Sequence, residues 1–563
     1  GSGIRSRSVD SFTPKILTTM REGYDFSLYK ADAIAGLTVA IVALPLSMAL
    51  AIASGASPDK GLVTAIIAGF LISFFGGSRV QVGGPTGAFV VVVFNVIAQH
   101  GYDGLLIATL MAGMILIAAG VFRIGRLIKF IPHPVVTGFT AGIAVIIASS
   151  QVKDFLGLSL ENVPSEFLPK WQAYFGAISS VHVATLLVGL GAFSVIVALR
   201  RFAPKLPGFL IALILAAAVV AVLKLPVDTI GTRFPDMAST IPMPSLPALS
   251  WARIVELLPS AFTIAFLAGI EALLSAVVAD GMTGSRHRSN QELIGQGIAN
   301  LGSVAFGGLP ATGAIARTAT NIKAGAKTPV AGMMHALFIL IFVLFASDLM
   351  AYVPMTALAA ILFVVAWGMC EIDRFIALLR MPNSDRAVLL LTFGLTILVD
   401  LTVAIGVGVT LASLLFMARM SETVQLDNGN AADDDDEFHG DELDQRDDLP
   451  KGVEVFRISG PVFFGVAGEL LDAMRKIGRT PKVIILRMRL VPMLDASGVT
   501  MIEEFIEQAR VSGAKIILSG VQHQPKEMLV RVGLSGDHAG VFFETDYVAA
   551  LNLARQLSTI TLH

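Results

Sequence analysis

The chain has 563 residues, of which 54% are hydrophobic and only 15% are charged, and its mean hydropathy is +0.74. This composition excludes a wholly soluble protein. Lys and Arg number 41 against 43 Asp and Glu, a balance that argues against a protein that coats nucleic acid. The single cysteine, Cys370, excludes an intramolecular disulfide and a cysteine cluster that binds a metal.

Residues 1–30 form a polar N-terminal segment, and a membrane domain is expected over residues 31–420. There, apolar stretches alternate with short polar segments, as expected of helices that cross ~30 Å of hydrocarbon. We predict about fourteen spans, and hence an all-α polytopic fold. The clearest are Leu105–Val121, Val183–Leu199, Phe209–Val222, Leu337–Ala346, Ala357–Trp367 and Val388–Val399.

Lys and Arg gather in loops of one parity, namely those that follow the even-numbered spans. By the positive-inside rule, these loops, the N-terminus and the C-terminal domain are expected to be cytoplasmic, and the chain is expected in the inner (plasma) membrane. The clusters are Arg79 after the second span, Arg123, Arg126 and Lys129 after the fourth, Arg200, Arg201 and Lys205 after the sixth, Arg286 and Arg288 after the eighth, Lys323 and Lys327 after the tenth, and Arg374, Arg380 and Arg386 after the twelfth.

Two segments are too short and too often broken by Gly and Pro to span a bilayer, and they stand in corresponding halves of the domain. They are Gly83–Ala88 and Gly307–Ala314, and one constant offset aligns Thr86 with Thr312 and the two residues that follow each of them. Such matched, interrupted segments are typical of transporters built from inverted repeats with a site at the membrane midplane. We therefore predict two inverted repeats of seven spans, each with one half-helix.

A half-helix that begins near the midplane leaves its first N–H groups unpaired and places the positive end of its dipole there. Two such ends attract an anion. The glycines allow the ligand to approach the backbone closely, and Thr86 and Thr312 could each cap a helix or donate a hydroxyl to the ligand. The alternative is that Gly and Pro only permit close packing or kinks.

Two charged residues stand out within the apolar spans. Glu271 lies in the run Ile264–Val278, which otherwise lacks ionisable groups, and Ser275 shares its helix face. An intramembrane carboxylate usually faces a cavity, where it carries a proton or binds a cation. Arg317, one turn beyond Gly313, could balance the anion or pair with Glu271. The alternatives are a Glu that only stabilises packing and an Arg in a fixed structural ion pair.

The composition changes again after the last span. Residues 421–450 are predicted to be a linker, because the acidic run Asp433–Glu437 can neither enter lipid nor bury a core. Residues 451–563 alternate β-rich runs with amphipathic helical runs, which indicates a small soluble α/β domain. Its strands are expected at Val453–Ile458, Val483–Leu486 and Lys515–Leu518.

The run Asp280–Gly284 and the polar residues that follow it resemble the hallmark of the sulfate permease (SulP) or solute carrier 26 family, as do Gly84–Thr86 and Arg317. The resemblance implies core and gate domains, a homodimer and an anion site between spans three and ten, with part of span one. The residues after Asp280–Gly284 that contribute to this hallmark are His287, Asn290, Glu292, Leu293, Gly295, Gln296, Gly297 and Asn300. The implied substrate-binding residues are Thr86, Gly87, Ala88, Phe89, Gly313, Ala314, Ile315 and Arg317.

The coupling ion is implied to lie at Glu271, Ser275 and Gly313. Family members that move sodium with bicarbonate carry Asp where Glu271 stands and Thr where Ser275 stands. A Glu is typical of bacterial members described as proton-coupled, so we expect proton coupling, with sodium at Glu271 and Ser275 as the alternative. No other metal is expected.

The C-terminal domain resembles a STAS (sulfate transporter and anti-sigma antagonist) domain, on the motif Val491–Gly498. In soluble relatives a serine of this loop is phosphorylated, and Ser497 occupies a comparable place. Its regulatory role would suit a helix N-terminus, which tolerates a phosphate. The preferred alternative is that Asp495 and Ser497 simply cap the helix. The domain is expected to support dimerisation, trafficking or regulation, the last by binding a regulatory protein.

We therefore expect a secondary active transporter of a small anion, namely bicarbonate, sulfate or a C4-dicarboxylate, that works by alternating access. The resemblance implies an elevator movement, in which the core domain carries the site past the gate domain. The alternatives are an uncoupled exchanger or channel, and a sensor that binds an anion without moving it. The sequence has no P-loop, dinucleotide-binding glycine motif or nucleophile–base set, so neither enzyme activity nor a cofactor is expected.

Overall fold

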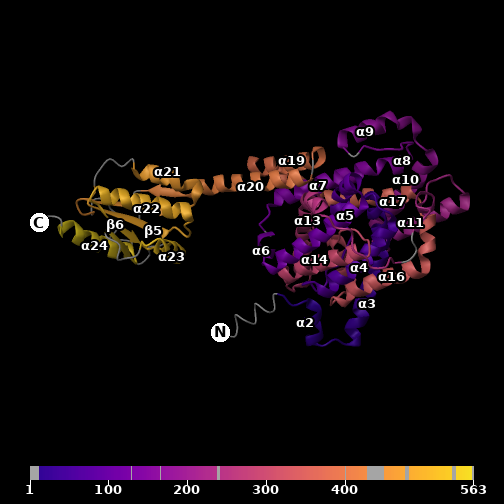
Figure 1. Cartoon of the computed structure of the whole chain (residues 1–563), viewed down its shortest axis with the longest axis horizontal. Coiled ribbons are helices and arrows are strands. Elements are labelled where there is room, and N and C mark those ends of the chain that lie inside the picture. Colours follow the sequence, from indigo (N-terminus) through magenta and orange to yellow (C-terminus); the bar gives the residue numbers. More distant parts are fainter. Residues whose placement is uncertain are drawn as a thin grey trace. The chain divides into compact units, whose positions relative to one another are not determined.

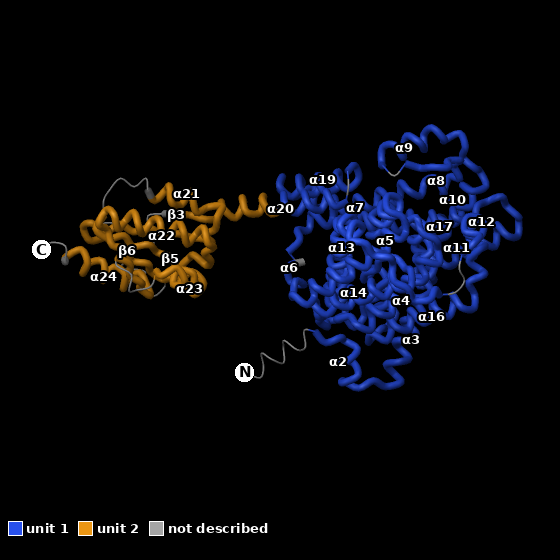
Figure 2. Tube along the Cα trace, viewed as in Figure 1, with its two compact units in different colours: residues 1–412 blue, residues 413–563 orange. Residues whose placement is uncertain are grey.

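The structure is a computed structural model that describes residues 12–128, 130–164, 166–237, 241–399, 401–427, 449–475, 481–534 and 540–560. Its internal contacts divide the chain into two compact units, Gly1–Ala412 and Ser413–His563 (Figure 2). Unit 1 is helical and encloses one large apolar core, whereas unit 2 is a small α/β domain with apolar cores of its own.

Figure 1 shows the helices of unit 1 in chain order. They are α2 (Lys15–Glu22), α3 (Phe26–Ala53), α4 (Pro58–Phe75), α5 (Val90–Val121), α6 (Gly125–Ile128), α7 (His133–Ser150), α8 (Val152–Leu156), α9 (Phe167–Gly176), α10 (Val183–Phe202), α11 (Gly208–Leu223), α12 (Ile230–Arg233), α13 (Trp251–Thr283), α14 (Ser289–Ala305), α15 (Ile315–Lys323), α16 (Val330–Ala346), α17 (Met355–Cys370), α18 (Ile372–Leu379), α19 (Asn383–Leu398) and α20 (Leu401–Thr423), the last of which continues into unit 2. Short 3₁₀ helices are η1 (Gly87–Phe89), η2 (Ile178–Ser180) and η3 (Ser347–Tyr352), and two short strands are β1 (Gly83–Gly84) and β2 (Thr312–Gly313).

Nine helical stretches of the described residues are long and apolar enough to cross a membrane. The prediction of about fourteen spans counts elements that this length criterion leaves out, including the short helices α11, α14, α15 and α19. In addition, α5 is two helices joined at Gly101, which has a φ of 75°. With the two parts of α5 counted separately and the connecting helices α2, α6, α8, α9, α12 and α18 left out, the described elements follow the predicted order of two sets of seven.

Two groups of helices in unit 1 pack mainly among themselves. This grouping agrees with the division into core and gate domains that the family resemblance implies. The groups touch where α3 contacts α11 and α17, where α5 contacts α7, and where η1 contacts α7 and α17. The core group comprises α3, α4, α5, α13, α14, α15 and α16, and the gate group comprises α7, α8, α10, α11, α17 and α19.

Contacts between loops agree with the predicted parity. Arg79, after the second span, pairs with Glu22 of the N-terminal segment at 2.8 Å. Arg288, after the eighth span, donates to the carbonyl of Thr13 at 2.8 Å. On the opposite side of unit 1 from α2 and α6, α12 packs against η3, which joins α16 to α17 (Figure 2). The even-numbered loops that contact the N-terminal segment therefore share one side of the domain.

Unit 2 is built on a five-stranded sheet with the order β3-β4-β5-β6-β7, parallel except for the antiparallel edge strand β3. Alternate side chains of β4 face different cores, because successive side chains of a strand point to opposite faces. Phe456 and Ile458 pack with α21, α22 and α23, whereas Val453 and Val455 pack with α24. The elements are β3 (Gln425–Asp427), β4 (Val453–Ser459), α21 (Phe464–Arg475), β5 (Val483–Leu490), α22 (Ala496–Val511), β6 (Lys515–Ser519), α23 (His523–Arg531), β7 (Val541–Glu544) and α24 (Tyr547–Ile560). This arrangement confirms the small α/β domain.

The range predicted for the linker, residues 421–450, contains part of the folded domain. Helix α20 continues to Thr423, and β3 pairs with β4 through Leu426 and Ile458. Val424 and Leu426 pack against the core of unit 2, so the domain begins before the acidic run. So short a strand has too brief a pattern to be recognised by periodicity, which explains the difference. Residues 428–448 lie outside the described residues.

Candidate functional site

The two interrupted segments, far apart in sequence, lie side by side at the centre of the core group. Gly83 of β1 pairs with Gly313 of β2, and Gly84 pairs with Thr312, in antiparallel register. Each strand leads into a helix: β1 is followed by η1 and α5, and β2 is followed by α15. Two helix N-termini, one from each half of the domain, therefore lie within a few residues of the crossing point, where their unpaired N–H groups can bind an anion.

The positions of the two strands correct the alignment of the internal repeat. The predicted offset matches Thr86 with Thr312, but β1 begins at Gly83, before Thr86, whereas β2 begins at Thr312 itself. Thr312 accordingly lies in a strand and not at a helix start, and its hydroxyl donates to the carbonyl of Ala268 in α13 at 2.7 Å. The expectation that Thr312 caps a helix is wrong, because Ala314 occupies the N-cap position of α15 and the constant offset misses this shift of two residues.

Thr86, in contrast, lies where its own hydroxyl can bind a ligand. It is the residue immediately before η1, and it makes no side-chain capping bond. Its Oγ1 is buried and has no hydrogen-bond partner among the described residues. A buried hydroxyl without a partner is costly, so a bound ligand or water at the start of η1 would satisfy it.

Arg317 reaches from α15 back to the segment that follows β1. One terminal nitrogen donates to the carbonyl of Pro85 at 2.8 Å, and the residue is only 2% exposed. Its Nε and its other terminal nitrogen have no hydrogen-bond partner among the described residues. A Cβ on Gly84 would lie 2.5 Å from that second nitrogen, so the absence of a side chain there makes room for the guanidinium. An anion would supply the missing acceptors.

Glu271 lies alongside this arrangement on α13. Residues 268, 271 and 275 share one face of the helix, because they are separated by three and four positions. Ala268 contacts Thr312 of β2, and the hydroxyl of Ser275 donates to Oγ1 of Thr318 in α15 at 3.2 Å. Glu271 therefore faces the junction of β2 and α15, and it is partly exposed. No ion pair between Glu271 and Arg317 occurs in the described part of the chain, contrary to one of the two predicted roles of Arg317.

The predicted coupling residues thus come from two adjoining elements, Glu271 and Ser275 from α13 and Gly313 from β2. A Cβ on Gly313 would clash with the side chain of Gln81, so a glycine is required where β2 passes that amide. The carboxylate of Glu271 and the hydroxyl of Ser275 are oxygen ligands of the kind that sodium accepts. No cluster of three or more His, Cys, Asp or Glu side chains that could hold a metal occurs in the described ranges.

The residues of η1 are buried, whereas the first residue of α15 is exposed. Ala88 and Phe89 are buried, and a Cβ on Gly87 would lie 2.6 Å from the sulfur of Met369, which belongs to the gate helix α17. At the other end Ala314 donates its N–H to the carbonyl of Val82 at 2.9 Å, so that N–H is already used. Ile315, the first residue of α15, is 37% exposed. The first turn of α15 is therefore the more exposed of the two helix starts.

Sequence reasoning assigned no role to the polar face of α14, which turns out to support both half-helices. Glu292 accepts hydrogen bonds from the side chains of Gln81 and Gln296, each at 2.7 Å, and from the N–H of Gly77 at 2.8 Å. Asn300 exchanges two hydrogen bonds of 2.9 Å with the backbone of Ala311, just before β2. The signal was present as polar residues at positions 292, 296 and 300, four apart on one face of a helix.

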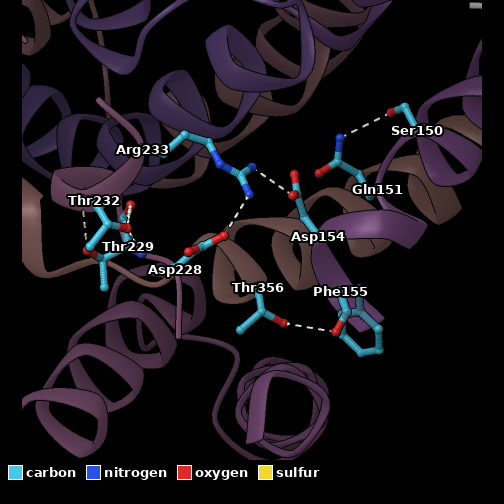
Figure 3. Close-up of polar contacts among 9 residues, drawn as sticks. All are labelled: Ser150, Gln151, Asp154, Phe155, Asp228, Thr229, Thr232, Arg233 and Thr356. Atoms are coloured by element: carbon cyan, nitrogen blue, oxygen red, sulfur yellow. Dashed lines mark hydrogen bonds and ion pairs between the residues drawn. The ribbon is translucent and has the colours of Figure 1, made fainter. Parts of the chain in front are cut away.

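Side-chain contacts connect elements of the gate group near α8 and α17 (Figure 3). Arg233 of α12 lies between two carboxylates, with distances of 2.7 Å to Asp154 of α8 and 3.2 Å to Asp228. Thr356, at the start of α17, donates to the carbonyl of Phe155 at 3.3 Å. These contacts join α8, α12 and α17, so this end of the gate group is cross-linked through side chains (Figure 3).

Comparison with known families extends this description. A family model for the sulfate permease family matches residues 29–392, and a model for the STAS domain matches residues 447–545. The chain belongs to the sulfate permease family. The helical region that carries the half-helices is thus the sulfate permease domain, and unit 2 contains the STAS domain. Members of this family are transporters and not enzymes, as expected.

Similar sulfate permease family proteins occur in several bacteria. YvdB of Bacillus subtilis (strain 168), whose name assigns it provisionally to sulfate transport, is 41% identical over 516 residues, which cover 91% of this chain and 95% of that protein. The bicarbonate transporter BicA of Picosynechococcus sp. is 31% identical over 533 residues, which cover 90% of this chain and 92% of that one.

Two solved structures resemble this sulfate permease family protein. The transmembrane domain of a cyanobacterial bicarbonate transporter, BicA, matches with a TM-score of 0.61 at 31% identity, over 69% of this chain and 98% of that chain. The overall structure of SLC26A9 matches with a TM-score of 0.83 at 17% identity, over 100% of this chain and 96% of that chain. At 17% identity the second likeness shows the fold alone, which is a helical membrane domain followed by a STAS domain.

The hydrogen bonds of the STAS loop favour the helix-capping interpretation. Asp495 is the N-cap of α22, where its carboxylate accepts the N–H of Gly498 at 2.8 Å and that of Phe464 at 3.0 Å. Ser497 lies in the first turn of α22 and is partly exposed. The cap is therefore Asp495 alone, and phosphorylation of Ser497 stays a prediction.

Asp495→Ala should destabilise α22 by about 1 kcal/mol, because the helix loses its N-cap and the Phe464 N–H loses its acceptor. Ser497→Ala should change little, since the N-cap bond of α22 comes from Asp495. Hydrogen exchange of the α22 amides in the full-length protein measures both effects. Equal protection in the two variants would show that Asp495 does not stabilise the helix.

Proposed function

We propose that this protein is a secondary active transporter of a small anion that binds between the half-helix N-termini at η1 and α15. The observation that carries the proposal is the buried guanidinium of Arg317, which has two nitrogens without partners, among the described residues, beside the unpartnered hydroxyl of Thr86. Relatives named for sulfate and bicarbonate transport support these two oxyanions as substrates, and a C4-dicarboxylate would satisfy the same donors.

The proposed coupling residue is Glu271, with a proton as the coupling ion. Glu271 lies on the face of α13 that contacts β2 and α15, so protonation changes the charge beside the anion site by one unit. Sodium held by Glu271, Ser275 and the backbone of Gly313 is the alternative. No other cofactor is required, because moving an anion breaks no covalent bond.

The proposed transport cycle is of the elevator type, in which the core group carries the site past the gate group. The separate packing of the two helix groups supports this movement. The basic even-numbered loops favour a cytoplasmic N-terminus and STAS domain in a cell whose inner membrane holds the protein. A homodimer is part of the same proposal.

The test is uptake of labelled bicarbonate, sulfate and fumarate into proteoliposomes, with an inward proton gradient, an inward sodium gradient or neither. We expect one anion to accumulate above equilibrium only with a proton gradient. Glu271→Gln should abolish that accumulation, because glutamine neither releases nor takes up a proton.

Glu256→Gln is the matched control, because Glu256 lies on the same helix but its side chain is 58% exposed. It should transport as the unmodified protein does. If a sodium gradient drives the accumulation instead, sodium replaces the proton as the proposed coupling ion. Equal fluxes without any gradient, or an unaffected Glu271→Gln variant, would favour an uncoupled exchanger or channel.

A further inference from the structure

One buried cation has no role in the site described above. Lys170 of α9 is only 6% exposed, and its Nζ lies over the ring of Phe94 at 6.0 Å from the ring centroid. It forms no ion pair within the ranges that the structure describes. Burial lowers the pKa of the Lys170 ammonium, since the charged form has lost water without gaining a carboxylate. Burying an ammonium without a carboxylate partner costs free energy, so the position of Lys170 needs an explanation.

Helix α9 is anchored to the gate group. The indole N–H of Trp171 donates to the hydroxyl of Ser149 at 3.1 Å, and the hydroxyl of Tyr174 donates to the carbonyl of Ser149 at 2.7 Å. Ser149 belongs to α7, and α9 also packs against α19. Lys170 is therefore held on the gate side, in the connection between the predicted fifth and sixth spans.

Phe94 belongs instead to the core group. It lies on α5, seven residues beyond Gly87 and therefore roughly 10 Å along the helix from the start of η1. Its ring also lies against Gly55, just after α3, where an added Cβ would be 3.4 Å from the ring. The contact between Lys170 and Phe94 thus joins the two helix groups beyond the anion site, toward the loops that follow odd-numbered spans.

We propose that Lys170 closes the outer side of the anion pathway against Phe94 and that, when the core group moves, its ammonium becomes the first binding site for an anion entering from outside. The proposal rests on the proposed transport function and orientation. The ligand is the transported oxyanion or carboxylate, which a desolvated ammonium attracts. The contact with an aromatic ring gives the cation a partner while the pathway is closed.

The first test is uptake as a function of external anion concentration, in proteoliposomes with the outer side exposed. Lys170→Gln should raise the external KM about tenfold, as expected for loss of one charge-assisted contact, and should weaken the dependence of uptake on ionic strength. Lys170→Arg should keep the external KM near that of the unmodified protein. Lys224→Gln, which removes an exposed lysine on the same side, is the control and should change neither quantity.

A Lys170→Gln variant that transports with an unchanged external KM would overturn the proposal. If the unmodified protein itself moves no anion, the proposed function fails first, so the two failures are distinguishable. A lysine that only packs its aliphatic stem would alter thermal stability in Lys170→Gln without altering the external KM or the salt dependence.

The second test uses cross-linking and depends on the single cysteine of the chain. In a Cys370→Ala background, Lys170→Cys combined with Phe94→Cys should react with a short bifunctional thiol reagent, and the linked protein should stop transporting. Each single cysteine variant treated with the same reagent should keep its own untreated rate. Full transport by the cross-linked protein would show that the two positions need not separate, which contradicts the proposal.

Discussion

Arg317→Gln should strongly reduce concentrative anion uptake while leaving the protein folded. The guanidinium has a single protein acceptor, the carbonyl of Pro85, and two of its nitrogens are without partners among the described residues. A charge-assisted hydrogen bond contributes about 1.5–3 kcal/mol, so its loss should weaken anion binding roughly 10- to 100-fold. The measurement is anion affinity by calorimetry on the purified protein, together with uptake into proteoliposomes.

Lys323→Gln provides the control, because Lys323 is exposed near the other end of the same short helix α15. It should bind and transport the anion normally. Thermal unfolding separates binding from folding: Arg317→Gln should unfold within a few degrees of the unmodified protein without anion, and added anion should no longer stabilise it. An anion that still stabilises Arg317→Gln to the same extent would exclude Arg317 from the site.

Glu292→Ala should strongly destabilise unit 1. The carboxylate is buried and accepts hydrogen bonds from Gln81, Gln296 and Gly77, all of which would lose their partner. A buried donor without an acceptor costs about 1–3 kcal/mol, so a total of about 3–5 kcal/mol is expected after partial relaxation. Because Gln81 packs against Gly313, the half-helix site should be distorted as well.

Comparing the thermal stability of two Glu292 variants tests whether the hydrogen bonds to this carboxylate stabilise unit 1. Glu292→Gln keeps one carbonyl oxygen for the two glutamine side chains but presents an amide donor to the N–H of Gly77. Thermal unfolding in detergent should therefore rank the unmodified protein above Glu292→Gln, and Glu292→Gln above Glu292→Ala. Glu256→Gln should match the unmodified protein. If Glu292→Gln and Glu292→Ala unfold at the same temperature, the hydrogen bonds to Glu292 do not determine stability.

Patterns that repeat along the chain predicted much of the architecture. Apolar runs and the polar segments between them indicated the helical domain, and alternating strand and helix patterns indicated the α/β domain. The matched, interrupted segments predicted that two helices begin inside the core group, and β1 pairs with β2 there. These features are local or periodic, so they are visible without knowledge of which elements pack together.

Contacts between distant elements could not be predicted in the same way. Thr312 lies on the same helix-start motif as Thr86 in the sequence, yet its hydroxyl is taken by Ala268, 44 residues away. The polar face of α14 was visible as a spacing, but Gly77 and Gln81, which donate to Glu292, are 215 and 211 residues away from it. No periodicity specifies which of many buried donors meets which acceptor.

Hydropathy, glycine and proline act within a few residues, so they are enough to predict a polytopic membrane protein with two interrupted helices and a small α/β domain. Three features became visible only in the folded chain. They are the register of β1 against β2, the single hydrogen bond that the described residues offer to the Arg317 guanidinium, and the burial of Lys170 against Phe94. Burial and hydrogen-bond satisfaction depend on what the rest of the fold brings to each residue, and that depends on packing across the whole unit.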